Sequence, residues 1–166
     1  MKGSQLKLTL AIAGSRHYSD YSTFSRVVTD ELERFQCSLI VTGDATGVDT
    51  MVLNYCIEHQ RRFRVYCADS RTFERLERQG VDVIAVSDWL TYGKSAGPVR
   101  NAVMVDIADR LLLFNGGGPG SRSVKNLARS KGIEVEEWMI DASSISTRDI
   151  VGGTVVASVH GGSTFI

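Results

Sequence analysis

Short apolar segments alternate with amphipathic segments along most of the chain. Six segments read as strands, namely residues 7–13, 38–42, 62–68, 81–87, 110–115 and 133–140. The first of them is almost continuously apolar, which is typical of a strand buried on both faces. Five intervening segments repeat their apolar positions with a helical period of about 3.6 residues. They are residues 23–35, 48–56, 72–79, 99–108 and 122–131.

This alternation predicts the fold class. Strands that alternate with helices over short connections form a parallel sheet with helices on both faces. We therefore predict an α/β domain with a Rossmann-like sheet over residues 1–148. Residues 149–166 alternate apolar residues with Gly, Ser and Thr, and they predict a C-terminal β extension that forms either a hairpin or a tail.

Some helix ends carry recognisable signals. Ser22 and Ser70 are the expected N-caps of the helices at 23–35 and 72–79, and Gly80 and Gly132 are expected to end helices. Glu31 is a polar break in the otherwise apolar face of the first helix.

Glycine-rich or polar loops follow three of the predicted strands. They are residues 14–16, 43–49 and 116–121. In an open parallel sheet, ligands lie beyond the carboxyl ends of the strands, so we expect these loops to share one site. Glycine lets the backbone approach a ligand closely, Arg16 offers a planar donor for phosphate or carboxylate, and a glycine-rich turn that opens a helix is an anion site in general form.

A fourth element, residues 96–101, adds Arg100 and Asn101 to the predicted site. Pro98 suits the first turn of a helix. Trp89 and Lys94 lie in the preceding loop, where an aromatic side chain either stacks on a base or closes the core. The expected ligand-binding residues are Gly14, Ser15, Arg16, Gly43, Asp44, Ala45, Gly47, Asp49, Trp89, Lys94, Pro98, Arg100, Asn101, Gly116, Gly117, Gly118, Gly120 and Ser121.

Composition narrows the classes of function. The chain has 19 Lys and Arg and 19 Asp and Glu, and this zero net charge argues against nucleic-acid binding through bulk electrostatics. No apolar run approaches the roughly 20 residues of a membrane helix, so we expect no membrane partner. The three cysteines lie in apolar runs without metal-ligand spacing, which favours free buried thiols in a reducing cytoplasm and predicts no metal site.

The four loop segments together resemble a known family. GSRHYSD, GDATGVD, W-x-x-YGKSAGPVRNAVM and DRLLLFNGGGPGS have the order and spacing of motifs in the SLOG superfamily, and within it they are similar to the small YspA-like (DUF2493) group. The resemblance runs from about Leu8 to Val135. It implies a Rossmann-like fold and a pocket for a nucleotide-derived ligand such as a nucleoside phosphate, an ADP-ribose or NAD derivative, or a cyclic nucleotide signal. It also implies a role in signalling, including phage defence or counter-defence.

The chain departs from one branch of that superfamily. The LOG phosphoribohydrolases carry a PGGxGTxxE motif with a catalytic Glu, and here Val124 occupies that position while Ser121 replaces the Thr. Cleavage of an N-glycosidic bond by the LOG mechanism is therefore not expected, and no cofactor is certain. Residues 69–87 look like an insertion that either reshapes the pocket rim or forms a subunit contact.

Three functions follow as hypotheses. The first is a sensor or sequestering protein for a nucleotide-derived small molecule, and we expect it to be a homo-oligomer. The second is a hydrolase of an N-glycosidic or phosphate bond, for which Asp20, Asp44 and Asp49 are the available carboxylates and Asp49 is the candidate catalytic residue. In the first helical turn, however, capping of amides or binding of ribose is expected of Asp49 ahead of catalysis. The third, less favoured, is single-stranded DNA binding as in the superfamily member DprA.

Overall fold

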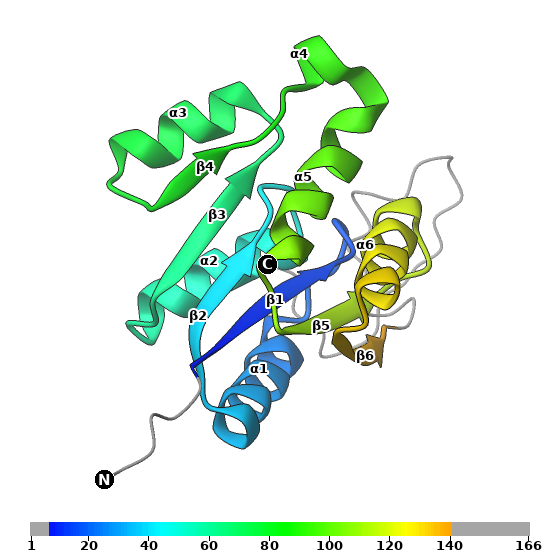
Figure 1. Cartoon of the computed structure of the whole chain (residues 1–166). Helices are drawn as coiled ribbons and strands as arrows, with labels where there is room; N and C mark the ends of the chain where they lie inside the picture. Colours follow the sequence, from blue (N-terminus) through cyan, green and yellow to red (C-terminus); the bar gives the residue numbers. More distant parts are fainter. Residues whose placement is uncertain (1–6, 141–166) are drawn as a thin grey trace, which may run out of the picture.

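A parallel sheet organises the computed structural model, which describes residues 7–140 of the chain (Figure 1). Its strands are β1 (Leu8–Gly14), β2 (Cys37–Thr42), β3 (Phe63–Cys67), β4 (Val83–Ala85), β5 (Arg110–Asn115) and β6 (Glu134–Met139). The order across the sheet is β4-β3-β2-β1-β5-β6, and every pair is parallel. The predicted Rossmann-like α/β fold is confirmed. The predicted extension at 149–166 lies outside the described residues.

The strand order determines which face each helix covers. The chain steps outward from β1 to β4 and then returns to β5 beside β1, and right-handed crossovers place helices on opposite faces for the two directions. On one face lie α1 (Tyr21–Phe35), α2 (Val48–Glu58) and α3 (Ser70–Arg78). On the other lie α5 (Ala96–Asp106) and α6 (Pro119–Lys131). The order in which successive strands are added to the sheet reverses between β1 and β5, and open α/β sheets bind their ligands at such a point.

Two apolar layers form the core because strand side chains alternate between faces. Leu10 and Ile12 of β1 pack with α1 and α2, whereas Ala11 and Ala13 pack with α5 and α6. In β5 the same alternation buries every residue from Leu111 to Asn115. This explains why the strand is continuously apolar in sequence.

The N-terminal ends of two helices differ from the prediction. α1 begins at Tyr21, and Asp20 rather than Ser22 caps it by accepting a hydrogen bond from the Thr23 amide at 3.1 Å. α3 begins at Ser70, and Asp69 rather than Ser70 caps it. In both cases an aspartate stands just before the helix, and its carboxylate is a stronger acceptor for helix amides than a serine hydroxyl.

The segment 88–98, predicted as a loop, is largely helical. It contains α4 (Trp89–Tyr92) and a 3₁₀ turn at Gly93–Ser95, which runs into α5 at Ala96, three residues before the predicted start at 99. α6 likewise starts at Pro119 rather than at 122, with proline in the position where its missing N–H removes no bond. Strand β4 is shorter than the predicted 81–87.

The three thiols are free and buried, as the sequence predicted. Burial raises the pKa of Cys56 and of Cys67 to about 12, so neither is a thiolate at neutral pH. In the part of the chain that the structure describes, no helix is both long enough and apolar enough to span a bilayer.

Glu31, the polar break in α1, is a buried carboxylate. Its side chain is 1% exposed, and its oxygens lie 3.4 Å from Nη2 of Arg110 at the start of β5 and 3.4 Å from Nη2 of Arg34. The Arg110 guanidinium also stacks on the ring of Phe35. Burial raises the pKa of Glu31, and Arg110 opposes that shift. The ion pair therefore joins α1 to β5 at the amino edge of the sheet.

Removal of the Arg110 guanidinium should destabilise the protein, because Glu31 stays buried. We predict that Arg110→Met lowers the free energy of unfolding by about 3 kcal/mol near pH 8, because the buried, charged Glu31 keeps only the half-exposed Arg34 as a partner. Its pKa then rises further, so the loss relative to the parent protein shrinks as the pH falls and Glu31 is protonated. Urea denaturation of both proteins at several pH values measures this. The double variant Arg110→Met with Glu31→Leu should recover most of the loss, and a loss independent of pH would contradict the assignment.

Candidate functional site

Backbone hydrogen bonds join the loops that follow β1, β2 and β5 at the carboxyl edge of the sheet. The Ser15 amide donates to the carbonyl oxygen of Phe114 at 3.1 Å, and the Val48 amide donates to the carbonyl oxygen of Ser15 at 3.1 Å. The Thr46 hydroxyl donates to the carbonyl oxygen of Arg16 at 3.2 Å. The first loop is thereby held between the other two, and the three predicted loops lie side by side.

Two glycines permit this close approach. Gly47 has φ +72°, and a Cβ there would run into the backbone of Ser15 and Arg16. A Cβ at Gly14 would lie 2.5 Å from the carbonyl oxygen of Phe114. Side chains at these positions would separate the loops, so both glycines serve packing between loops.

A buried ion pair joins α5 to the loop after β2. Nη1 of Arg100 lies 2.7 Å from Oδ1 of Asp44, and the two side chains are 10% and 4% exposed. Nε of Arg100 donates to Oδ1 of Asn101 at 2.8 Å. The Asp44 carboxylate also accepts from the amides of Ala68 and Asp69, each at 3.0 Å. The guanidinium predicted as a ligand clamp is thus directed inward, and the ion pair joins α5 to the loops after β2 and β3.

The Asp49 side chain is also directed inward. Its Oδ2 accepts from the Ala45 amide at 3.0 Å, and its Oδ1 lies 3.1 Å from Oγ1 of Thr42. Asp49 is 7% exposed, and burial raises the pKa of its carboxyl, while the nearby Arg100 opposes that shift. Of the two alternatives for a residue in the first helical turn, the structure places Asp49 on a loop amide. Binding of ribose by this residue stays a prediction.

The Thr42 hydroxyl lies between two acceptors, one of which is the Asp49 carboxyl. The hydroxyl has a single proton, and it lies 2.9 Å from the carbonyl oxygen of Ile12 as well as 3.1 Å from Asp49. Its proton is therefore shared between the Ile12 carbonyl oxygen and Oδ1 of Asp49.

The glycine-rich turn after β5 is organised by its neighbours. Oδ1 of Asn115 accepts from the Gly117 amide at 2.7 Å, and Nη1 of Arg122 donates to the carbonyl oxygen of Gly117 at 2.7 Å. Gly116 lies against the side chain of Ser15. The turn is therefore held between β5, the first loop and α6.

α6 starts without a side-chain cap. Gly118 is its N-cap residue, and Pro119, Gly120 and Ser121 form its first turn. Pro119 has no N–H, so the amides of Gly120 and Ser121 are the first donors at this helix end. Such amides, together with the helix dipole, favour an anion.

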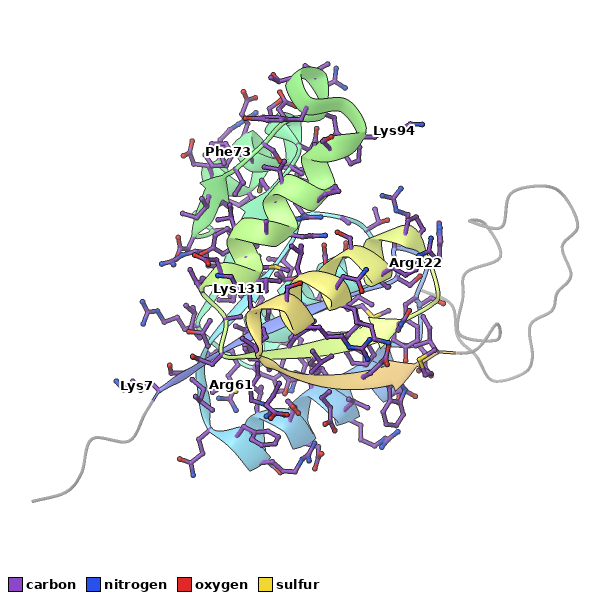
Figure 2. The ribbon with its side chains drawn as sticks, turned by 45° about the vertical axis from the view of Figure 1, so that its right-hand side comes forward. Lys7, Arg61, Phe73, Lys94, Arg122 and Lys131 are labelled. Atoms are coloured by element: carbon purple, nitrogen blue, oxygen red, sulfur yellow. The ribbon has the colours of Figure 1, made fainter. Side chains whose placement is uncertain are left out.

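Around this edge the acidic side chains are engaged in contacts within the protein, whereas several basic side chains are exposed. The carboxylates of Asp20, Asp69 and Asp88 cap helices, Asp44 and Asp49 are buried in the contacts above, and Glu137 pairs with Asn115 and Lys125. Four cations at this edge are exposed, namely Arg16, Arg71, Lys94 and Arg122. Figure 2 shows Lys94 near the start of α5 and Arg122 near the start of α6. A chain with zero net charge thus has a locally cationic edge.

The structure does not bring all predicted site residues together. Trp89 lies on α4, and its amide donates to the carbonyl oxygen of Ala68 at the end of β3. β3 and β5 are separated by β2 and β1, which is about 14 Å at the usual strand spacing. Trp89, Lys94 and the exposed Pro98 therefore belong to the β3 side of the edge, and residues 116–121 belong to the β5 side.

Three residues with clear roles at this edge were not predicted. Thr42 supports Asp49, Asn115 shapes the glycine-rich turn, and Arg122 covers it. Asn115 had a local signal, because an asparagine directly before glycines is typical of a turn closed by its own side chain. Among the described residues, no cluster of three or more His, Cys, Asp or Glu side chains is arranged for a metal ion.

Comparison with known proteins identifies the fold alone. No family model matches the chain, and no curated protein matches it by sequence. DNA processing protein A (DprA) from Streptococcus pneumoniae has a similar structure, with a TM-score of 0.63 and 19% sequence identity. The match covers 79% of this chain and 50% of that protein, so the chain spans about half its length. The chain therefore has the DprA-like form of the Rossmann-like fold.

The packing at Gly43 yields a prediction for stability. A Cβ at this position would lie 2.6 Å from Cζ of Arg100 and 2.7 Å from Oδ2 of Asp49, so Gly43→Ala must displace the guanidinium from Asp44. We expect a loss of about 3 kcal/mol in the free energy of unfolding, measured by urea denaturation. Gly97→Ala is the matched control, because no heavy atom lies within 4 Å of its Cβ position. Equal stability of the two variants would contradict the packing described.

Proposed function

We propose that the chain binds a nucleotide-derived small molecule at the carboxyl edge of its sheet, and that it belongs to the YspA-like group of the SLOG superfamily. The observation that carries the proposal is the start of α6, where uncapped amides follow a glycine-rich turn beside β1. This is the position at which the sheet changes direction, where such folds bind ligands. Phosphate at that helix end would meet amide donors and a favourable dipole.

The distribution of charge supports the same conclusion. The carboxylates at this edge accept hydrogen bonds from the protein, whereas Arg16 is exposed and Arg122 covers the turn, where its Nη1 donates to the carbonyl oxygen of Gly117. A phosphate-bearing ligand would therefore enter a site that attracts anions without a generally basic surface. The ligand would be a nucleoside phosphate, an ADP-ribose or NAD derivative, or a cyclic nucleotide signal, in a sensing or sequestering role.

The residues of the buried network act indirectly in this proposal. Arg100, Asp44 and Asp49 bind one another and loop amides, so they position the loops that contact the ligand. Ser15, Gly117, Gly120 and Ser121 are the residues placed to approach a phosphate. Hydrolysis would require Asp49 to act on the ligand from its buried position, which makes binding the better supported function.

The exposed cations at the turn should contribute to affinity. With a panel of nucleoside phosphates, NAD⁺, ADP-ribose and cyclic dinucleotides, we expect at least one compound to raise the melting temperature. For that compound, Arg16→Gln and Arg122→Gln should each weaken binding about tenfold in calorimetry, since each removes a charged hydrogen-bond donor. Arg129→Gln, in the last turn of the same helix, should bind like the parent protein. If no compound in the panel alters the melting temperature, the proposal is wrong.

An amide at position 49 distinguishes a structural role from catalysis. Asp49→Asn keeps an acceptor for the Ala45 amide and gains an N–H for Thr42, so we expect stability within about 1 kcal/mol and unchanged ligand affinity. Asp49→Leu lacks both partners and should lower stability and affinity together. Incubation of the ligand with the parent protein, followed by chromatography, should return it intact. Turnover by the parent protein that Asp49→Asn abolishes would establish the hydrolase instead.

Single-stranded DNA is the second candidate, favoured by the DprA-like fold and by the exposed aromatic rings of Trp89 and Tyr92 beside Lys94. Bases stack on exposed aromatic side chains in proteins that bind single strands. The function predicts salt-dependent binding of an oligonucleotide that Trp89→Ala and Tyr92→Ala weaken. The small-molecule proposal predicts no such binding at physiological salt, and fluorescence anisotropy separates the two.

A further inference from the structure

An open pocket lies at the amino edge of the sheet, at the other ends of the strands from the glycine-rich loops. Its volume is about 400 Å³, and it lies where α1 ends and β2 begins, beside the residues just before β1 and β3. This volume is at the small end of the roughly 300–1,000 Å³ of small-molecule sites. Figure 2 shows two lining residues, Lys7 and Arg61, on the opposite side of the view from Lys94 and Arg122. The pocket is therefore separate from the candidate site described above.

The buried part of the pocket wall is apolar. Leu32 of α1 and Cys37 of β2 line it, and they are 3% and 6% exposed. Both belong to the core cluster on the α1 face of the sheet. Burial raises the pKa of the Cys37 thiol, so this side chain is uncharged at neutral pH and packs as a small apolar group. The deep end of the pocket thus suits an apolar group of a ligand.

Charged side chains of both signs surround this apolar wall without pairing. Lys7, Glu33 and Arg61 all line the pocket and are exposed. Within residues 7–140, none of these three side chains forms an ion pair or a hydrogen bond with another residue. Arg61 opposes the rise in the pKa of Cys37, so its positive charge acts at the buried wall. The fold therefore holds one negative and two positive charges around one pocket, too far apart to neutralise each other.

The end of α1 adds acceptors for a positive group on the Glu33 side of the pocket. The helix is closed by Gln36 in the left-handed conformation, and the Gln36 amide donates to the carbonyl oxygen of Leu32. The carbonyl groups of residues 33–35 have no amide partner within the helix, and the negative end of its dipole favours a cation. Arg34 in the same turn already pairs with three carboxylates. A second positive group beside Glu33 would therefore be stabilised by the helix end as well.

We propose that this pocket binds a free α-amino acid with an apolar side chain. The carboxylate and the ammonium of such a zwitterion are attached to the same carbon, so one small molecule meets charges of both signs. Its carboxylate binds the guanidinium of Arg61 and the ammonium of Lys7. Its own ammonium binds Glu33 and the end of α1. Its side chain covers the buried wall formed by Leu32 and Cys37.

A ligand of a single charge sign fits the pocket less well. An anion would bind Lys7 and Arg61, but it would also meet Glu33 and the negative end of α1. A cation would meet the two basic side chains. The carboxyl edge differs, because the uncapped start of α6 and exposed cations favour an anion there. The two edges therefore favour different classes of ligand, and the amino acid site is independent of the function proposed above.

Chemical derivatives of the amino acid test the assignment on the full-length chain. L-Alanine, L-valine, L-leucine and L-methionine are each added at about 10 mM, tenfold above a dissociation constant of about 1 mM, and at least one should raise the melting temperature. For the strongest binder, the N-acetyl derivative lacks the ammonium and the methyl ester lacks the carboxylate. Each derivative should bind about tenfold more weakly in calorimetry, because each loses a charged group.

Substitutions of exposed lining residues locate the site. Arg61→Gln and Glu33→Gln should each weaken binding of the free amino acid about tenfold, since each removes a charged partner. Arg62→Gln is the matched control, because Arg62 is the exposed neighbour of Arg61 and does not line the pocket, and this variant should bind like the parent protein. The proposal is overturned if none of the four amino acids alters the melting temperature, or if a derivative binds as tightly as the free amino acid. Unchanged affinity in Arg61→Gln or in Glu33→Gln would overturn it equally.

Discussion

The ion pair between Arg100 and Asp44 is the contact on which the carboxyl edge of the sheet depends. Arg100 comes from α5 on one face, and Asp44 comes from the loop that leads to α2 on the other. Asp44 in turn holds the amides of Ala68 and Asp69 after β3. A buried ion pair of this kind contributes little net stability, because desolvation offsets much of its attraction. Its effect is to fix the relative positions of α5 and two loops.

The same pair shapes the electrostatics of the edge. With Arg100 directed inward, the guanidinium neutralises Asp44 and lies close to Asp49, so the buried carboxylates add little negative potential outside. Of the remaining acids at the edge, Asp20, Asp69 and Asp88 cap helices, and Glu137 pairs with Asn115 and Lys125. The positive end of α6 and the exposed Arg16 and Arg122 therefore lie among acids that are already engaged.

Local patterns predicted the parts of the fold that depend on local physics. The buried strand at 110–115, the helix ends at Gly80 and Gly132, and the loops that gather glycines all follow from periodicity and backbone preference. The direction of the Arg100 side chain could not be predicted, because its partner is 56 residues away and no spacing rule relates the two. Glu31 is similar: its neighbours in α1 indicated a polar break, and only the fold brings Arg110 beside it.

The two sides of α5 differ in what they contact. Its inner side holds Arg100 and Asn101 against the loops, and its outer flank presents Val99, Val103 and Ile107. A helix that is apolar on more than one side is ordinarily packed between two layers, whereas the described residues supply one of them. Since Val103 follows Arg100 by less than one helical turn, the segment of α5 that carries the guanidinium is also the segment whose outer flank is apolar.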